Sequence, residues 1–210
     1  MSDYYLTTID FYTLHYFASF CVVLYIIENS VIDGKMPKTF AKWGKTRHLR
    51  RNFIVIKILF ICHGNICRSP TAEFVMKELV RQAGLSDEFY IESRATSTEE
   101  IWNGRGNPIY EPARKLLREH GIPYDEKKRA TLLTHADYEH FDLLIAMDAR
   151  NLTGIRRILG EGAMDKVTKL RSYSDGRGDI DDPWYTDDYE GVYRQIEDGC
   201  RGLMRTLTER

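Results

Sequence analysis

The fold of this chain is decided by the stretch F-I-C-H-G-N-I-C-R-S-P-T-A-E, residues 60 to 73. It follows the apolar run Ile54 to Phe60 and leads into the amphipathic run Ala72 to Ala83. This order predicts a buried strand, a tight loop and a helix. Such a loop lies beyond the carboxyl end of its strand, which is where the ligands of open α/β sheets bind.

The loop has the composition of a phosphate-binding turn. Cys62 and Arg68 have the spacing C-x5-R, and Gly64 and Asn65 tolerate backbone angles that turn successive N–H groups into one concavity. Ser69 suits the start of the helix, whose positive end then also faces the concavity. The planar guanidinium of Arg68 can bind two phosphate oxygens. Cys62, in the same positive field, is expected to act as a thiolate nucleophile.

The segment C-H-G-N-I-C-R-S-P resembles the signature loop of the low-molecular-weight protein tyrosine phosphatases, C-x-G-N-x-C-R-S-P. Unrelated phosphatase folds share C-x5-R, whereas the G-N, the second cysteine and R-S-P are much more specific. A structural pair of buried cysteines and half of a zinc site are the other interpretations, but none of the four cysteines forms a C-x-x-C pair. The resemblance implies that phosphate is bound by the whole loop: Cys62, His63, Gly64, Asn65, Ile66, Cys67, Arg68 and Ser69.

The resemblance covers nearly all of residues 57 to 210. Further segments have counterparts in the family: I-E-S-R-A-T-S at 91 to 97, G-N-P at 106 to 108, H-G-I-P at 120 to 123, and F-D-L-L-I-A-M-D at 141 to 148. D-D-P-W-Y at 181 to 185 resembles the family's D-P-Y-Y, whose aspartate is the general acid. The resemblance thus implies that Asp182 protonates the departing tyrosine oxygen and then activates water.

The acidic segment before Pro183 has two other interpretations. Asp175, Asp179, Asp181 and Asp182 imitate a calcium loop, but the glycine at the sixth position and the glutamate at the twelfth are missing. A charge-rich loop is also often solvated surface, which we expect for Asp179 and Asp181. For Asp182 the D-P-aromatic-aromatic context favours the acid.

A bound phenyl phosphate needs flat apolar walls, and three aromatic residues are candidates for them. Trp184 and Tyr185 occupy the two positions after D-P, and Tyr185 is the better candidate. Trp102 follows the second expected strand, although a tryptophan is more often part of a core. Its surroundings, W-N-G-R, depart from the family's spacing, so its position is left open.

Two further thiols and one lysine need separate interpretation. Cys67 has the placement of a redox partner for the nucleophile, or else it is a structural thiol, and Cys200 is expected in the core. Lys128, in K-R-A-T-L-L at 128 to 133, stands where the family pattern H-x-A-R-Q-[IL] has a histidine that supports the loop asparagine. Because an ammonium group cannot accept a hydrogen bond, the support of Asn65 is left open.

The remaining chain alternates strands and helices. Strands are predicted at Lys57 to Ile61, Phe89 to Ala95, Phe141 to Met147 and Lys166 to Leu170. Helices are predicted at Ser69 to Ala83, Pro108 to His120, Asn151 to Leu159 and Tyr189 to Leu207. This order predicts an α/β, Rossmann-like, doubly wound sheet of four parallel strands with helices on both faces.

Residues 1 to 54 form an extension to a catalytic domain at residues 55 to 210. Phe11 to Ile27 carries no formal charge and is barely long enough to span a bilayer. No basic residue precedes it, which argues against a secretory signal. Three interpretations stay open: a membrane helix with a basic linker, a soluble appendage, and a spurious start. If the segment is a membrane helix, the positive-inside rule predicts that the catalytic domain lies in the cytoplasm.

The composition fits a cytoplasmic enzyme. The net charge of −1 gives no sign of a nucleic-acid partner. Residues 1 to 57 hold 8 Lys and Arg against 4 Asp and Glu, which gives +4, and the remainder holds 22 against 27, which gives −5. The cysteine usage fits a reducing compartment. We expect a monomer without metal or cofactor, whose partner is a phosphotyrosine protein or peptide.

The sequence therefore predicts a protein tyrosine phosphatase that works through a phosphocysteine at Cys62. Arsenate reductase uses the same scaffold but needs two further cysteines, and only Cys200 remains in the domain. Phosphoarginine phosphatases resemble this chain but carry threonine where Ile66 stands. A non-catalytic phosphate-binding module is the alternative from another class, and the presence of Cys62, Arg68 and Asp182 argues against it.

Overall fold

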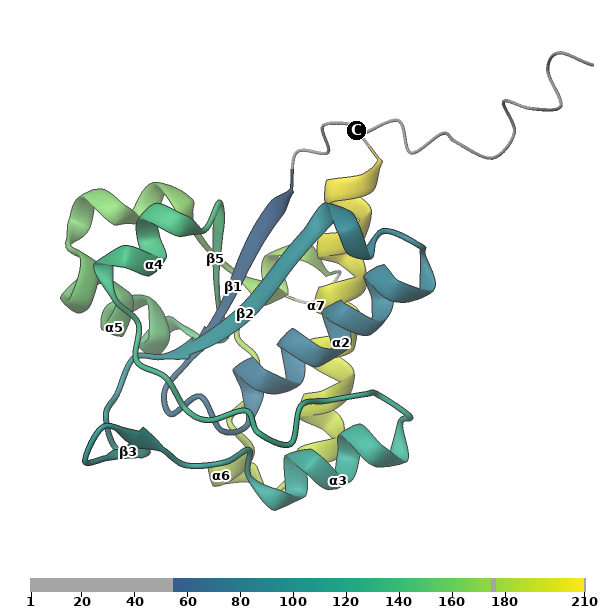
Figure 1. Cartoon of the computed structure of the whole chain (residues 1–210), viewed down its shortest axis with the longest axis horizontal. Helices are drawn as coiled ribbons and strands as arrows, with labels where there is room; N and C mark the ends of the chain where they lie inside the picture. The colour runs from purple at the N-terminus through teal and green to yellow at the C-terminus, as the bar shows by residue number, and fades with distance from the viewer. Residues whose placement is uncertain (1–54, 175–176, 210) are drawn as a thin grey trace, which may run out of the picture. The chain divides into compact units, whose positions relative to one another are not determined.

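A parallel four-stranded sheet with the order β2-β1-β5-β6 forms the centre of the computed structural model, which describes residues 55 to 174 and 177 to 209 (Figure 1). Its strands are β1 (Ile56–Cys62), β2 (Phe89–Ala95), β5 (Leu143–Ala146) and β6 (Val167–Lys169). The chain passes from β1 to β2 on one side and returns to β5 on the other. The order of the strands therefore reverses at β1, and the predicted doubly wound sheet is confirmed.

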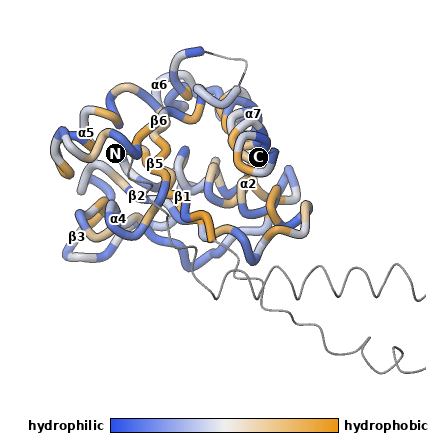
Figure 2. The backbone as a smooth tube through the Cα atoms, turned by 90° about the horizontal axis from the view of Figure 1, so that it is seen from above, coloured by the Kyte–Doolittle hydropathy of each residue, from blue (hydrophilic) through white to orange (hydrophobic). Residues whose placement is uncertain are grey.

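Helices cover both faces of the sheet because the side chains of β1 are apolar on both sides. Ile58 and Phe60 pack in one core with α2 (Arg68–Gln82) and α7 (Tyr189–Thr208). Leu59 and Ile61 belong to a second core, to which α4 (His135–His140) and α5 (Ala149–Leu159) contribute. The remaining long helix, α3 (Glu111–Glu119), packs beside α2 and α7. Figure 2 shows the hydrophobic residues gathered along the central strands.

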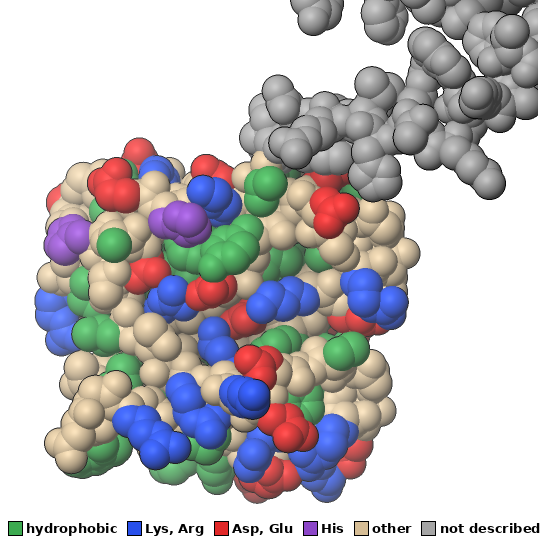
Figure 3. Space-filling view, in the orientation of Figure 1, with side chains coloured by type: hydrophobic (Ala, Val, Ile, Leu, Met, Phe, Trp, Pro, Cys, Tyr) green, Lys and Arg blue, Asp and Glu red, His purple; other side chains and the backbone are tan. Residues whose placement is uncertain are grey.

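The outer surface is polar and mixed in charge. On the face drawn in Figure 3, side chains of both signs are exposed, and several Lys and Arg side chains lie next to one another at the lower left. The net charge of the whole chain is −1.

The eight predicted strands and helices all exist, and most of their bounds differ from the structure by one or two residues. Smaller elements were not predicted: α4, the hairpin of β3 (Ile101–Trp102) and β4 (Arg105–Gly106), α6 (Pro183–Thr186), and three 3-10 helices at Ser86–Glu88, Glu161–Lys166 and Leu170–Tyr173. Two of them had a local signal. Thr134 and Asp137 form a capping box at the start of α4. Asn103 and Gly104, with φ of 49° and 75°, form the N-G turn of the hairpin.

A close backbone contact fixes the base of this hairpin. A Cβ atom on Gly106 would lie 1.9 Å from the carbonyl oxygen of Ala130, so only glycine fits there. The Ala130 amide donates a hydrogen bond to the carbonyl oxygen of Asn107 at 2.9 Å. The hairpin is thereby anchored to residues 129 to 131, beside the carboxyl ends of β1 and β2.

The N-terminal extension lies outside the described residues, and so does the membrane helix predicted at residues 11 to 27. Within residues 55 to 174 and 177 to 209, no helix combines the length and the apolar character that crossing a bilayer requires. The division of the chain near residue 54 stays a prediction.

Candidate active site

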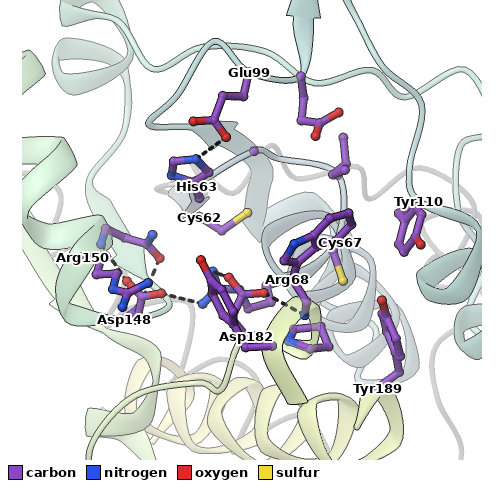
Figure 4. A pocket seen from close by; sticks show the side chains of 17 residues that line it. Cys62, His63, Cys67, Arg68, Glu99, Tyr110, Asp148, Arg150, Asp182 and Tyr189 are labelled. Atoms are coloured by element: carbon purple, nitrogen blue, oxygen red, sulfur yellow. Dashed lines mark hydrogen bonds and ion pairs between the residues drawn. The ribbon is translucent and has the colours of Figure 1, made fainter. Parts of the chain in front are cut away.

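The loop of residues 63 to 67 lies where the strand order reverses, beyond the carboxyl end of β1. Cys62 is the last residue of β1, and α2 begins at Arg68, so strand, loop and helix follow each other as predicted. A cleft of about 340 Å³ opens over this loop (Figure 4). The segment after β5 forms a second side of the cleft, and the start of α6 forms a third.

The loop wraps around the Cys62 sulfur. Asn65 has the left-handed φ of 56° that its sequence context predicted, and its amide donates to Cys62 Sγ at 3.3 Å. Ser69 Oγ lies 3.0 Å from the same sulfur. Cys62 is buried except toward the cleft. Hydrogen bonds of this kind stabilise a thiolate more than a thiol.

Arg68 points into the cleft from the first turn of α2, and its side chain is only 3% exposed. NH1 pairs with Asp148 Oδ2 at 2.6 Å, and NH2 pairs with Asp182 Oδ2 at 2.5 Å. Burial acts against the charged form, but the Cys62 sulfur and the two carboxylates outweigh it and raise the pKa of Arg68. The guanidinium is therefore a permanent cation at the floor of the cleft.

Asp148 is a residue that the sequence reasoning missed. It caps α5, because its Oδ1 accepts from the Asn151 amide at 2.7 Å while the Asn151 side chain accepts from the Asp148 amide at 3.2 Å. This capping box leaves Oδ2 free to orient Arg68. A signal existed in the sequence, since Asp148 is the first charged residue after the apolar strand β5.

Asp182 stands across the cleft from the loop, at the start of α6. Its Oδ1 caps this helix by accepting from the Trp184 amide at 3.2 Å, and its Oδ2 faces Arg68. The side chain is 29% exposed, so it remains in contact with solvent at the mouth. Asp179 and Asp181, its acidic neighbours, are exposed as expected, and they pair with Lys169 and Gln195.

Two of the three expected aromatic residues lie at the cleft. Trp184 and Tyr185 line it, with the guanidinium of Arg150 5.7 Å from the Tyr185 ring. Trp102, in the β3–β4 hairpin, is not among the lining residues, and its role as a wall stays a prediction.

Two tyrosines that the sequence reasoning missed also line the cleft. The ring of Tyr110 lies 6.1 Å from that of Trp184 and 6.3 Å from that of Tyr189. Burial, with Tyr110 and Cys67 close by, raises the pKa of Tyr189 to about 12. Tyr189 therefore presents a neutral ring to the cleft. Tyr110 directly precedes α3 and Tyr189 begins α7, far apart in the sequence, and no local pattern marks them.

The rim of the cleft next to the loop is acidic. His63 pairs with Glu99 at 2.8 Å and is half-exposed. Glu100 lies directly over Gly64, and its carboxylate accepts from the Asn107 side chain at 2.7 Å. A Cβ atom on Gly64 would lie 2.9 Å from Glu100 Cγ, so a larger residue here would push the Glu100 side chain aside.

Cys67 and Cys200 differ in their environment. Cys67 lines the cleft, and its burial next to Cys62 raises the pKa of its thiol to about 12. Cys67 is therefore not a second thiolate. Cys200 lies in the core between α7 and α2, where burial raises the pKa of its thiol, and the expected packing role is consistent with this position.

Asn65 is supported without a histidine. The Thr131 amide donates to Asn65 Oδ1 at 3.0 Å, and Asn65 Nδ2 donates to Ser93 at 2.8 Å and to Ser69 at 3.0 Å. These three partners fix the amide plane and hold the left-handed residue in place. The side chain of Asn65 therefore lies behind the loop and not in the cleft.

No group of three His, Cys, Asp or Glu side chains in the described ranges is arranged to hold a metal ion. The carboxylates nearest the loop, Asp148 and Asp182, are engaged by Arg68. The expectation of a reaction without metal or cofactor stays a prediction.

Comparison with known proteins identifies the family. The family model described as low molecular weight phosphotyrosine protein phosphatase matches residues 57 to 210. The chain belongs to this family. The family suggested by the sequence of the loop is thereby confirmed.

Several relatives share the whole catalytic region. The low-molecular-weight protein-tyrosine-phosphatase YfkJ of Bacillus subtilis is 34% identical over 155 residues, which are 73% of this chain and 96% of the relative. Low molecular weight phosphotyrosine protein phosphatase 2 of Drosophila melanogaster is 37% identical, over 70% of this chain and 90% of the relative. The crystal structure of SP-PTP from Streptococcus pyogenes has a TM-score of 0.66 at 38% identity and covers 73% of this chain and 94% of its own.

Membership of the phosphatase family establishes the class of reaction. The chain is a low-molecular-weight protein-tyrosine-phosphatase, a phosphoric monoester hydrolase, and the predicted activity is confirmed at this level. The crystal structure of YfkJ, with a TM-score of 0.69, has the same fold. The roles of individual residues rest on the geometry of the site.

We predict that Asp148→Asn lowers kcat/KM by about 10- to 100-fold, because a hydrogen bond between charged groups contributes about 1.5–3 kcal/mol. Asparagine keeps the cap of α5 but loses the charge that holds Arg68. Steady-state kinetics on a phosphotyrosine peptide measure the loss. The matched control is Asp179→Asn, which removes an exposed carboxylate paired with Lys169 and is expected to keep full activity. Equal losses in both variants would contradict the positioning of Arg68 by Asp148.

Proposed function

We propose that this phosphatase hydrolyses phosphotyrosine in proteins or peptides through a phosphocysteine at Cys62, with Asp182 as general acid and base. One observation carries the proposal. Cys62 Sγ lies at the floor of the cleft, within hydrogen-bond reach of the Asn65 amide and Ser69, and the loop that surrounds it ends at Arg68. The nucleophile Cys62, the oxyanion site at the loop and Arg68, and the acid Asp182 therefore all face the same cleft.

In the first step the Cys62 thiolate attacks phosphorus and the bond from phosphorus to the tyrosine oxygen breaks. The equatorial oxygens lie against the loop amides and Arg68, which stabilise the charge spread over them in the transition state. Asp182, which leaves Arg68 and takes up a proton from solvent when the phosphate binds, gives this proton to the departing oxygen. The products of this step are a phosphocysteine and the free tyrosine hydroxyl.

In the second step water attacks the phosphocysteine. Asp182, now a carboxylate, takes a proton from this water, and the electron pair of the phosphorus–sulfur bond returns to Cys62. A hydrogen bond from Ser69 to the sulfur, which lies 3.0 Å from its hydroxyl oxygen, stabilises the departing thiolate. Phosphate then leaves through the open mouth.

The walls of the cleft support an aromatic substrate. Four aromatic side chains line it: Tyr110, Trp184, Tyr185 and Tyr189. A phenyl ring that packs against them buries apolar area. Ile66, which lines the same cleft, adds an apolar contact near the phosphate.

The test of this proposal compares substrates. We expect the full-length protein to release phosphate from a phosphotyrosine peptide, with and without chelator, far faster than from a phosphoarginine peptide. Dithiol-dependent reduction of arsenate is expected to be undetectable. Faster release from phosphoarginine would overturn the substrate assignment, and tight phosphate binding without turnover would indicate the non-catalytic module.

The proposed setting of the enzyme follows from the chemistry of the loop. A thiolate nucleophile with a second thiol nearby requires a reducing compartment, so we place the catalytic domain, residues 55 to 210, in the cytoplasm as a monomer. Membrane fractionation of the expressed full chain distinguishes the three interpretations of residues 1 to 54. These are a membrane helix with a basic linker, a soluble appendage and a spurious start.

Oxidation provides a prediction for Cys67. Peroxide should convert the Cys62 thiolate to a sulfenic acid, and the Cys67 thiol then displaces water from it to form a disulfide. Cys67 is not the first target, because its pKa of about 12 keeps it protonated. We expect wild-type activity to be lost in peroxide and regained with dithiothreitol, whereas Cys67→Ser is lost permanently through further oxidation. Phosphate should protect both proteins.

The matched control for this experiment is Cys200→Ala, which removes a buried thiol far along the chain and should behave as wild type. Full recovery of Cys67→Ser after dithiothreitol would show that Cys67 is a structural thiol only.

A further inference from the structure

Three charged side chains at the mouth of the cleft have no part in the proposed mechanism. Glu99, Glu100 and Arg150 all line the cleft. None of the three pairs with a lysine, arginine, aspartate or glutamate of the described part of the chain. By contrast Arg156, on the same helix as Arg150, pairs with Glu161 at 2.6 Å. The unpaired charges of the rim are therefore free to meet charges of a bound substrate.

One side of the rim is negative. Glu99 and Glu100 lie between β2 and β3, next to the phosphate loop. The partner of Glu99 is the imidazole of His63, which balances the charge of the carboxylate only when it is protonated. The partner of Glu100 is the side-chain amide of Asn107, a neutral donor. Two carboxylates thus remain without a permanent cation on this side.

Another side of the rim is positive. Arg150 is the second residue of α5, where the helix dipole disfavours a cation, so its charge does not stabilise its own helix. The nearby carboxylates of Asp148 and Asp182 are already held by Arg68. The guanidinium of Arg150 lies instead 5.7 Å from the centre of the Tyr185 ring, which holds it at the cleft without neutralising it.

The two charged sides lie apart from each other around the nucleophile. Figure 4 shows Glu99 and Arg150 at different sides of Cys62, and no ion pair joins them. A peptide whose phosphotyrosine reaches Cys62 must leave the cleft over its rim in both chain directions. Because an extended chain advances about 3.3 Å per residue, the two residues on each side of the phosphotyrosine are the ones that meet the rim.

We propose that the rim selects substrates by the order of charges around the phosphotyrosine. Arg150 binds an acidic side chain on one side of it, and Glu99 with Glu100 binds a basic side chain on the other. The proposal rests on the proposed function, in which the substrate is a phosphotyrosine protein or peptide. Because the rim holds both signs, the order of the charges matters and not the net charge of the substrate.

The size of the effect follows from the exposure of these side chains. One ion pair in contact with solvent changes an equilibrium by about two- to fivefold, and salt screens it. Charges at a rim act mainly on the association of the two partners. The effect is therefore expected in kcat/KM, and the two sides together should give about a tenfold difference between a matched and a mismatched peptide.

Two peptides of identical composition test the proposal on the full-length protein. One carries two lysines before the phosphotyrosine and two aspartates after it, and the other carries the same residues in the reverse order. Their net charges are equal, so the overall charge of the enzyme acts on both alike. We expect kcat/KM to differ about tenfold between them at low ionic strength. In about 1 M NaCl, which screens charges beyond about 3 Å, the ratio should approach one.

Charge reversal then assigns the ratio to the named residues. Arg150→Glu changes the positive side, and Glu99→Lys together with Glu100→Gln changes the negative side, where glutamine keeps an acceptor for Asn107. Each change alone should bring the ratio of the two peptides close to one. The combined variant should prefer the peptide that the wild type disfavours. Because each ratio is measured on one enzyme, a general loss of activity or of folded protein cancels.

The matched control is Arg156→Glu, which reverses a charge on the same helix as Arg150. Arg156 pairs with Glu161 and does not line the cleft, so the ratio of the two peptides should stay at the wild-type value.

Three outcomes would overturn the proposal. One is equal kcat/KM of the wild type for the two peptides. Another is a ratio that persists in 1 M NaCl, which would mean that the shape of the peptide decides and not its charge. The third is a ratio that the combined variant leaves unchanged. Failure of the proposed function gives a different result, because neither peptide would then release phosphate under any condition.

Discussion

Cys62→Ser is expected to lower kcat by about 10⁶-fold, the loss caused by removing the nucleophile of another covalent enzyme. Serine has nearly the same shape, but its hydroxyl is not ionised by the hydrogen bonds that stabilise a thiolate. Phosphate or vanadate should still bind, because Arg68 and the loop amides are unchanged. Steady-state turnover of a phosphotyrosine peptide and calorimetric titration with vanadate measure the two properties separately.

The control for this variant is Cys200→Ala, in which a thiol of the core is removed and the loop is untouched. It should turn over at the wild-type rate. Hydrolysis by Cys62→Ser near the wild-type rate would exclude Cys62 as the nucleophile. Loss of vanadate binding together with turnover would mean that the sulfur is needed to form the loop.

Asp182→Asn is expected to slow hydrolysis of phosphotyrosine by about 10²- to 10⁴-fold, the usual contribution of a positioned acid. Asparagine can still cap α6 by accepting from the Trp184 amide, so the loop should keep its place. An aryl phosphate with a good leaving group needs little protonation and should lose much less. Parallel kinetics on phosphotyrosine and on such an aryl phosphate measure the difference.

Asp181→Asn is the matched control, because Asp181 is exposed and pairs with Gln195 outside the cleft. It should leave both rates unchanged. Equal losses on both substrates in Asp182→Asn would show that Asp182 shapes the loop but donates no proton.

The parts of the site that are contiguous in sequence were predictable. The left-handed Asn65, the strand that ends at Cys62 and the helix that begins at Arg68 all follow from a single local pattern. The four-stranded doubly wound sheet followed from the alternation of strands and helices, and the family matches confirm it.

The site residues that the sequence did not predict come from separate elements of the fold. Asp148, Tyr110 and Tyr189 reach the cleft only because three different elements begin or end beside the loop. Trp102, a candidate for the wall, lies in a short hairpin that was not predicted, and it is not among the residues that line the cleft.

The two carboxylates on Arg68 make ligand binding an exchange. In this structure the guanidinium already holds Asp148 and Asp182, so an incoming phosphate must replace a resident anion and not merely shed water. Asp182, the more exposed of the two, is the one that a ligand can dislodge. A singly charged anion gains little from this replacement, whereas a phosphate dianion gains both charge and the loop amides. When the product phosphate leaves, the Asp182 carboxylate can pair with Arg68 again. Asp182 therefore competes with phosphate for Arg68, which favours product release before the next substrate binds.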